Sequence, residues 1–262
     1  MNHVLNAAIA GLSVVSFSVI GSSAYAFTFV NGGFQPTNLS APSAYIGGGQ
    51  VDITGWTVNS SYSFLVSDGT TATTNINAAS YGPDPVWGTT ISAPGGGPVS
   101  LYSPGQIVNS ADGSGWFIAM DGAYGLPASI KQTLTGLKVG QQYAVSFYQA
   151  SAQQSGFDGD STDQWQVSFG GASQLSTLMN HASKAPVSPW QKQMMTFTAN
   201  SSDQVLEFLA LGSPAGQPPF ALLSGVSVAE IPTPALLPGL IGLGLSAWRK
   251  RKSESAETST VS

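Results

Sequence analysis

Two segments of the chain alternate apolar and polar residues with a period of two. In 142–150, Tyr143, Val145 and Phe147 occupy every second position, and the same alternation runs through 164–170. Successive side chains of a strand point to opposite faces, so each segment predicts a strand with one buried and one hydrated face. No comparable stretch with a helical stripe of apolar residues occurs in the body of the chain, and we expect helices to be few and short.

The rest of the body, residues 27–230, continues this rhythm with Gly, Pro and Ser between short apolar segments. Further strands are predicted at 51–58, 62–66, 115–121, 128–135, 191–199, 204–211 and 221–228. Strands in this number predict an antiparallel β-sandwich, because two sheets can each bury one alternating face. The segments 67–114 and 153–163 interrupt the pattern and predict long loops, which on a rigid sandwich usually carry recognition.

The charge of the chain is unusually low and is unevenly distributed. Charged residues make up 8% of the sequence and the net charge is −5. The body contains four lysines, no arginine and eleven carboxylates, so it carries 4 − 11 = −7. Nucleic-acid binding is excluded, because affinity for phosphate rests on clustered Lys and Arg. The absence of Cys excludes disulfides, Cys-ligated zinc and thiol catalysis.

The N-terminal segment 4–20 is apolar and uncharged. It leads into small residues, with Ala24 and Ala26 at positions −3 and −1 of a cut before Phe27. This order predicts a secretory signal peptide over 1–26. The alternative is an N-terminal membrane helix that stays uncleaved.

The C-terminal segment 231–252 has three parts, followed by a polar tail over 253–262. A proline motif precedes an apolar stretch, 235–248, and a basic cluster: Pro232, Thr233, Pro234 and Ala235, then Arg249, Lys250, Arg251 and Lys252. The apolar stretch of 14 residues predicts a short transmembrane helix of about 21 Å, whereas spanning the hydrocarbon core takes roughly 20 residues or about 30 Å. The basic cluster would hold that end in the cytoplasm and leave the body exported.

This C-terminal order resembles the PEP-CTERM class of bacterial sorting signals, and Pro232-Thr233-Pro234-Ala235 matches its PTPA-CTERM variant. The resemblance implies recognition and processing by an exosortase, an integral-membrane enzyme. It covers roughly the last 30 residues. The tail departs from the class by extending beyond the basic cluster. A plain C-terminal membrane anchor is the alternative.

The landmarks of the body resemble secreted bacterial proteins with a galactose-binding-like jelly roll, related to β-sandwich carbohydrate-binding modules. The matching segments are 30–35, 55–58, 116–122, 130–143, Trp190 and 222–228. The resemblance implies association with exopolysaccharide or surface glycan, and a first strand that pairs near the last and hides both edges. The structural calcium that is frequent in the family would lie at Gln35 and Ser224. Both residues are uncharged in this chain, and because Ca²⁺ prefers carboxylate ligands this argues against an ion at that position.

Sugar recognition would use exposed aromatic faces together with carboxylate and amide groups. Residues of these types lie in loop-like sequence, with Asn109 and Gln154 nearby in the chain. The predicted ligand face is Tyr81, Asp84, Trp87, Tyr102, Asp112 and Tyr124. In contrast, Trp56, Trp116 and Trp165 follow strand patterns and are expected in the core.

Three carboxylates occur within six residues at Asp158, Asp160 and Asp163. This spacing with an intervening Gly could wrap oxygens around Ca²⁺, but the distal Glu of an EF-hand is missing. A solvated acidic hairpin loop accounts for the segment better. No other cofactor is predicted.

Features of an enzyme are weaker. His181 is the only histidine of the body, and it is expected at the surface because no G-x-S-x-G element marks a nucleophile for it. A glycoside hydrolase needs two facing carboxylates, for which Asp121 or Glu207 could serve. Glu207 fits the outer face of a strand better.

The sequence therefore predicts a non-enzymatic, exported β-sandwich at the cell envelope, cell surface or extracellular matrix of a Gram-negative-type bacterium. Its expected partners are an exosortase, the membrane before processing, and a glycan. Neutral sugars or proteins fit the acidic body better than anionic polymers. The alternatives are a structural matrix protein without a soluble ligand and a secreted polysaccharide hydrolase.

Overall fold

The computed structural model describes residues 27–39, 43–47, 51–59, 62–69, 101–103, 107–123 and 128–232. Within these ranges the chain forms strands and no helix: β1 (Ser43–Tyr45), β2 (Thr57–Val58), β3 (Ser63–Ser67), β4 (Trp116–Asp121), β5 (Ser129–Leu134), β6 (Gln142–Gln153), β7 (Ser161–Phe169), β8 (Ala172–Leu175), β9 (Met179–His181), β10 (Gln191–Thr198), β11 (Gln204–Ser213) and β12 (Pro219–Glu230). No membrane-spanning helix is found in the described part of the chain. The predicted signal peptide and the apolar stretch 235–248 lie outside the described residues.

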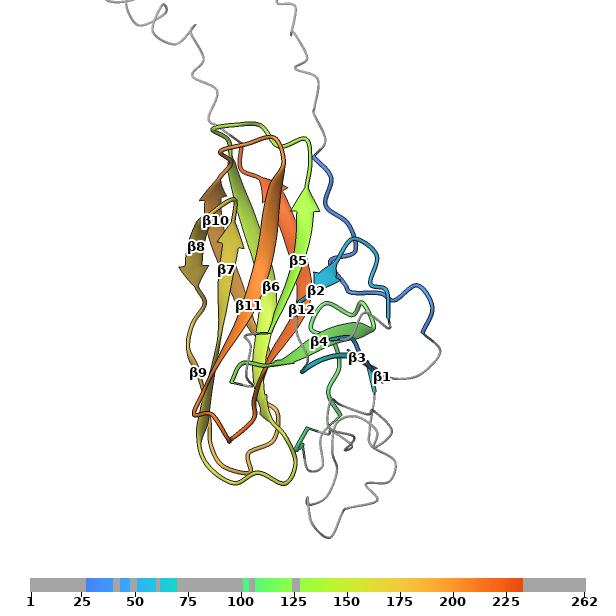
Figure 1. Cartoon of the computed structure of the whole chain (residues 1–262), viewed down its shortest axis with the longest axis vertical. Helices are drawn as coiled ribbons and strands as arrows, with labels where there is room; N and C mark the ends of the chain where they lie inside the picture. Colours follow the sequence, from blue (N-terminus) through green and yellow to red (C-terminus); the bar gives the residue numbers. More distant parts are fainter. Residues whose placement is uncertain are drawn as a thin grey trace, which may run out of the picture.

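Two antiparallel sheets stack on one another (Figure 1). The first sheet has the order β1-β3-β4-β12-β6-β10, and the second has the order β2-β5-β11-β7-β8, with β9 beside β7. The predicted all-β antiparallel sandwich is confirmed. The middle of the first sheet is the long pair β6 and β12, in which Leu222 lies opposite Ala150.

The main core fills the space between the sheets. Along β7 the residues alternate between buried and half-buried, so that Trp165, Val167 and Phe169 point inward as the periodicity predicts. Trp56 also lies in this core, and Trp116 packs against it while remaining half-buried. The sandwich is thus held by the alternating faces that the sequence displays.

A second apolar cluster covers the outer face of the first sheet. Phe64, Phe117 and Phe220 lie in it, and the loop residues Leu101 and Val187 pack over them. The first four residues of β3 and the first six of β12 are all buried, because both faces of the sheet are covered there. The outer face of this sheet is therefore a second packed layer.

Several predicted elements differ in the structure. Of the strand expected over 51–58, only Thr57–Val58 forms, and β1, β8 and β9 were not predicted. The expectation that both edges are hidden is wrong, because β12 lies inside the first sheet and β1 and β10 form its edges. The N-terminal segment reaches the last strand through one bond, from Val226 N to Gly32 O (2.9 Å).

The described chain begins and ends at the same end of the sandwich, here called the proximal end (Figure 1). The Phe27 ring packs on Tyr143 at 5.2 Å, and Ile231 N donates to Gln142 O at 2.9 Å. β6 runs from this end to Gln153, a span of about 37 Å at about 3.4 Å per residue. The opposite end, where β6 finishes, is called the distal end.

Candidate functional site at the distal end

A groove of about 750 Å³ lies toward the distal end of the sandwich. Two loop segments form its walls, 107–111 before β4 and 185–190 before β10, and β9 contributes Asn180 and His181. Apolar surface comes from Ile107, which is 62% exposed, and from prolines and Trp190. None of the described residues that line the groove is an acid, a lysine or an arginine.

Hydrogen bonds hold both walls in place. Trp190 Nε1 donates to Asn109 O at 2.8 Å, and its ring meets Phe117 edge-on at 5.7 Å. The other wall is tied to β6, because Ser188 N donates to Ser151 O at 2.9 Å and Ser151 N donates to Ser188 Oγ at 2.8 Å. The groove is therefore a preformed feature of the fold and belongs to its second apolar layer.

His181 is buried, with 2% of its surface exposed, so the expectation of a surface histidine is wrong. It belongs to the short strand β9, which pairs with β7 and turns the ring inward. The carbonyl of Ala185 can only accept, so Nε2 donates to it (3.1 Å) and Nδ1 accepts from Ser151 Oγ (3.2 Å). Burial lowers the pKa of His181. This neutral ring is a structural support of the groove.

A second hollow of about 380 Å³ lies beside the groove. The two share Asn180, His181 and Ala182, so they meet at β9. Thr162, Ser213 and Asp160 are among its other lining residues. Hydroxyl and amide groups, together with the Asp160 carboxylate, thus continue along this end of the sandwich.

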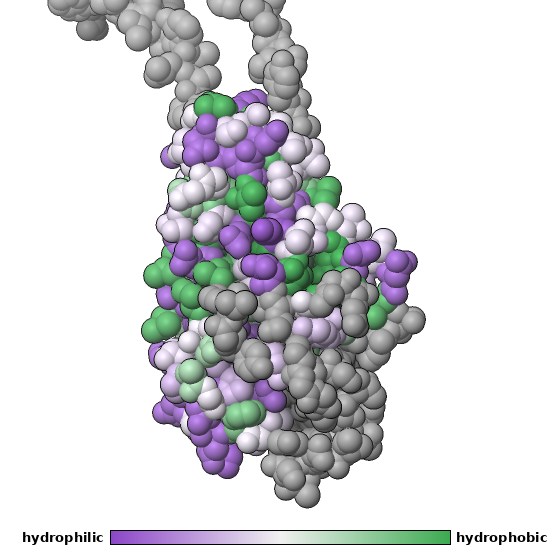
Figure 2. Space-filling view, viewed as in Figure 1, coloured by the Kyte–Doolittle hydropathy of each residue, from purple (hydrophilic) through white to green (hydrophobic). Residues whose placement is uncertain are grey.

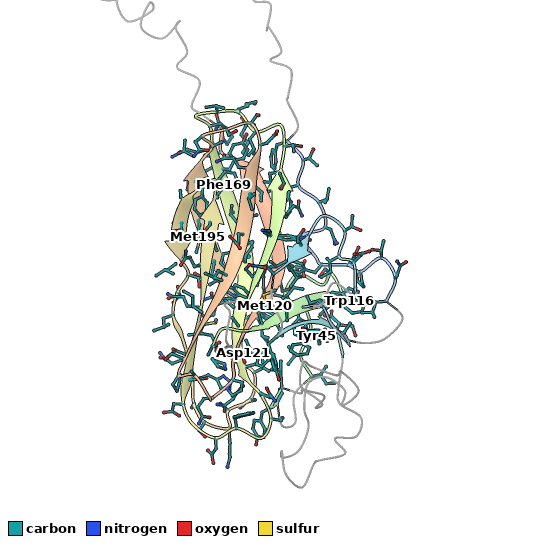
Figure 3. All side chains as sticks on the ribbon, viewed as in Figure 1. Tyr45, Trp116, Met120, Asp121, Phe169 and Met195 are labelled. Carbon is teal, nitrogen blue, oxygen red and sulfur yellow. The ribbon has the colours of Figure 1, made fainter. Side chains whose placement is uncertain are left out.

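A third, more enclosed hollow of about 220 Å³ lies at the end of β4; we call it the Asp121 pocket. Its described lining residues are Tyr62, Asp121, Ala123, Gln154, Phe157, Gly216 and Pro218. Asp121 Oδ1 accepts from Ala123 N at 2.8 Å, and Asp121 N donates to Tyr62 O at 3.0 Å. Figure 3 shows Asp121 in the distal half of the molecule, far from Phe169 near the proximal end.

Two of the predicted ligand residues lie within the described chain. Tyr102 is half-buried and its backbone N donates to Gln153 O at 2.9 Å, which places it at the end of β6 beside the Asp121 pocket. Asp112 lies elsewhere: its Oδ1 accepts from Ser224 Oγ at 3.1 Å, beside the last strand. The remaining four, Tyr81, Asp84, Trp87 and Tyr124, lie outside the described residues.

Asp112 supplies a carboxylate at the position of the family's calcium, where the uncharged Gln35 and Ser224 predict no ion. Gln35 Nε2 donates to Ser114 O at 3.3 Å there, and Ser224 Oγ is bonded to Asp112. These polar groups satisfy one another. The absence of a calcium ion at this site stays a prediction.

The three carboxylates of the predicted acidic loop do not converge. Ser183 Oγ donates to Asp158 Oδ1 at 2.6 Å, Lys184 Nζ lies 3.0 Å from its Oδ2, and Ser183 N donates to Asp160 at 2.8 Å. These contacts lower the pKa of Asp158. Asp163 is separate, because β7 begins at Ser161 and turns this side chain into the interior. The described part of the chain holds no group of three His, Cys, Asp or Glu side chains suited to a metal ion.

Asp163 is completely buried, and neither of its carboxylate oxygens has a hydrogen-bond partner among the described residues. Burial raises its pKa well above the usual range, and the negative charge of Asp121 adds to the effect. Gln149 Oε1, Gln153 Oε1 and Ser161 Oγ are buried and unpartnered in the same way. They belong to the inward faces of β6 and β7, so the distal interior is a polar extension of the apolar core.

The carboxylates considered for hydrolysis lie far apart in the fold. Glu207 lies opposite Lys131 on the outer side of the second sheet, as its strand pattern predicts. Asp121 lies in the first sheet and is 2% exposed. They do not form a facing pair.

Sequence reasoning missed most of the distal hollows. The sequence marks Trp190 only as a landmark of the resemblance, and it does not distinguish Tyr62, Phe157 or Asn180. Their sequence neighbourhoods are short loops or strand ends without a motif, so no local signal distinguishes them from ordinary surface residues. Asn109 and Gln154, noted beside the predicted ligand face, do line hollows.

No protein-family model matches the chain, and no curated protein matches it significantly. Among solved structures, it is similar to TmCBM61 in complex with β-1,4-galactotriose, at 11% identity over 68% of this chain and 90% of that chain, with a TM-score of 0.35. The CBM22-1 xylan-binding domain of Xyn10C from Paenibacillus barcinonensis matches at 11% identity over 52% and 81% of the two chains, with a TM-score of 0.30.

The enzymatically active domain of tailspike protein 4 from bacteriophage CBA120 matches at 10% identity, over 69% of this chain and 20% of that chain, with a TM-score of 0.33. Such low identities and TM-scores assign neither a ligand nor an activity to this chain. What it binds has to follow from its own hollows.

Proposed function

We propose that the protein is an exported, non-enzymatic glycan-binding β-sandwich that holds its ligand at the distal end. The observation that carries this proposal is the groove between 107–111 and 185–190, which joins a second hollow at β9. Its volume of about 750 Å³ falls in the range of ligand pockets. Apolar walls with a few amide and hydroxyl groups are what a sugar, with its apolar ring faces and hydroxyl edges, requires.

The charge of the body supports a ligand without anionic groups. The body carries four lysines against eleven carboxylates. An acidic polymer would be repelled by this field, whereas a neutral chain would not. The described residues that line the groove include no acid, lysine or arginine, which agrees with such a ligand.

Retardation in affinity gels and binding to a glycan array test the proposal. We expect Asn180→Ala and Ile107→Ser to weaken binding, because both side chains are exposed and line the groove. Thr198→Ala is the matched control, since this exposed residue lies opposite Gln142 at the proximal end. Unretarded migration of the unmodified chain through a broad panel of neutral polysaccharides would refute the proposal.

We further propose that the segment after Ile231 is the exosortase sorting signal that the sequence resembles. The body is closed just before it, because Lys138 Nζ binds both Glu230 carboxylate oxygens (2.9 and 3.1 Å) and Gln141 Nε2 binds Ile231 O. The test is to measure the intact mass of the protein recovered from the cell envelope and from the medium. The same measurement is made on a variant with alanine at positions 232–234. A mass that corresponds to a chain ending near Ile231, and that is not found for the variant, supports processing by an exosortase. A mass that still includes Arg249, for a protein found in the inner membrane, supports a plain anchor.

A structural matrix role is the second candidate, and one observation favours it. All four residues of the edge strand β8 are exposed; its last residue, Leu175, is 57% exposed, and Leu178, which follows the strand, is 51% exposed. Figure 2 shows hydrophobic residues at this margin of the molecule. Exposed edge strands are where sheets of different molecules join. Concentration-dependent assembly that Leu175→Lys abolishes would support this role.

A further inference from the structure

Several buried oxygen atoms at the distal end have no hydrogen-bond partner among the described residues. Both carboxylate oxygens of Asp163 are in this position, as are Gln149 Oε1, Gln153 Oε1 and Ser161 Oγ, and we call these five atoms the distal oxygen cluster. Asp163 and the two glutamines are 0% exposed, and Ser161 is 3% exposed. Buried polar groups are normally hydrogen-bonded, and buried charges are paired or coordinate a metal ion, so the cluster lacks a partner that it needs.

Strand geometry turns these side chains into the space between the sheets. Ser161 and Asp163 alternate in phase with the core residues of β7. Gln149 and Gln153 alternate in phase with the core residues of β6. Residues two apart on a strand share a face, so the cluster receives oxygen atoms from both sheets.

A contact between the sheets brings the positions of Gln153 and Asp163 together. In the first sheet Gln153 lies opposite Pro219, and in the second sheet Asp163 lies opposite Gly212. A Cβ on Gly212 would overlap the Pro219 ring, so these two residues touch across the interior. The positions of Gln153 and Asp163, which neighbour them on the paired strands, therefore adjoin.

Ser161 is linked to the same place through β9. It lies opposite His181, whose Nδ1 is 3.2 Å from Ser151 Oγ. Ser151 lies between Gln149 and Gln153 on the inward face of β6. Ser161 and His181 also line the second hollow, of about 380 Å³, so this hollow gives an ion a path to the cluster.

The two glutamines are oriented so that they present oxygen. Gln149 Nε2 donates to Thr177 O at 2.8 Å, and Gln153 Nε2 donates to Gly159 O at 2.9 Å. With the nitrogens engaged, the carbonyl oxygens remain as the free ends of both amides. Carboxylate and amide oxygens can only accept, and each unpartnered buried side-chain atom among the described residues is an oxygen.

The body offers no positive side chain to the carboxylate of Asp163. Its four lysines lie elsewhere: Lys131 is opposite Glu207, Lys138 binds Glu230, Lys184 binds Asp158, and Lys192 lies over the Tyr148 ring. The body has no arginine. Asp163 can therefore be ionised in the folded chain only if a cation from solution joins it; without one, it keeps its proton.

We propose that the distal oxygen cluster binds one Ca²⁺ ion, with Asp163 as the carboxylate ligand and Gln149, Gln153 and Ser161 as neutral oxygen ligands. Ca²⁺ takes about six to eight oxygen ligands in flexible geometry, amide oxygens and water among them, whereas Mg²⁺ requires a near-ideal octahedron. Water from the second hollow completes the coordination. The ion fastens β6 to β7 beside the groove and is thus a structural ion of the distal end.

Calorimetric titration of Ca²⁺ into the full-length chain, after treatment with chelator, tests the inference. We expect one Ca²⁺ per chain and an affinity for Mg²⁺ at least about tenfold lower. Asp163→Asn should weaken Ca²⁺ binding on the order of a hundredfold, because it removes the only carboxylate of the cluster. Ser161→Ala, which removes one neutral oxygen without a partner in the fold, should weaken it several-fold. Urea unfolding in chelator checks that both variants fold.

Two control variants remove the same charge from other places where calcium could bind. Asp160→Asn changes the exposed acidic loop, and Asp112→Asn changes the position of the family's calcium beside Ser224. Both should bind Ca²⁺ as the unmodified chain does. Binding that survives Asp163→Asn, or that either control abolishes, overturns the inference. An unmodified chain that takes up no Ca²⁺ at millimolar concentration overturns it as well and leaves water as the content of the cluster. The inference does not rest on glycan binding, and none of these outcomes bears on it.

Discussion

The ionisation of Asp163 determines how stability depends on pH. The side chain is 0% exposed, has no partner for either oxygen among the described residues, and has a pKa raised by burial and by Asp121. Unfolding exposes it to water, where the pKa is about 3.9. At pH values between about 3.9 and the raised pKa, Asp163 is protonated in the folded chain and deprotonated in the unfolded chain. Stability therefore falls as pH rises through this window, by at most about 1.4 kcal/mol per pH unit, and levels off above the raised pKa.

Asp163→Asn removes this dependence with little change in shape. The amide that replaces the carboxylate is neutral at every pH, so it stays uncharged in the buried position without taking up a proton. We expect the variant to be more stable than the unmodified chain at neutral pH, with a difference that grows from pH 4 upward and then reaches a plateau.

The assay is urea unfolding of the full-length chain and the variant from pH 4 to pH 9, and the quantity compared is the difference in unfolding free energy at each pH. With chelator present, taking the difference cancels the contributions of the titrating groups that do not interact with Asp163. Asp158→Asn is the control, because that carboxylate is exposed and its pKa is lowered by Ser183 and Lys184. A difference between Asp163→Asn and the unmodified chain that is constant over the whole range would refute the reasoning.

Three further predictions concern stability. His181→Gln should remove a pH dependence of opposite sign to that of Asp163. Burial lowers the pKa of His181, so the free energy of unfolding decreases as the pH falls below the ordinary histidine pKa near 6.5. Urea unfolding curves from pH 4 to pH 7 will show whether the variant lacks that decrease. Gly122→Ala should cost about 2 kcal/mol in urea unfolding, because its Cβ would overlap the backbone nitrogen of Gly212 where the two sheets meet. Glu230→Gln should lower the free energy of unfolding by under about 1 kcal/mol, because the side chains of the Lys138–Glu230 pair are 39% and 30% exposed. It should nevertheless accelerate hydrogen exchange at Ile231 N, measured by mass spectrometry. Unchanged exchange would show that the pair does not hold the end of β12.

Much of the sandwich follows from local sequence. Alternation places Tyr143, Phe147 and Trp165 in the core, since successive side chains of a strand must point to opposite faces. Strands β4, β5, β10, β11 and β12 lie where the pattern predicts them, within a few residues. By contrast β8 has four exposed residues and β9 only three in all, so neither has enough alternation to be recognised.

The sequence by itself determined the strand-rich, acidic, cysteine-free character of the body, because composition and period two are properties of neighbouring residues. Only the tertiary structure decided which polar residues are buried: Asp163 and His181 occupy polar segments, and strand pairing turns them inward. It also assembled the Asp121 pocket from Tyr62, Asp121 and Phe157, which are dozens of residues apart in the chain. Such a site depends on pairing between distant strands, and hydrophobic periodicity carries no information about which strands become neighbours.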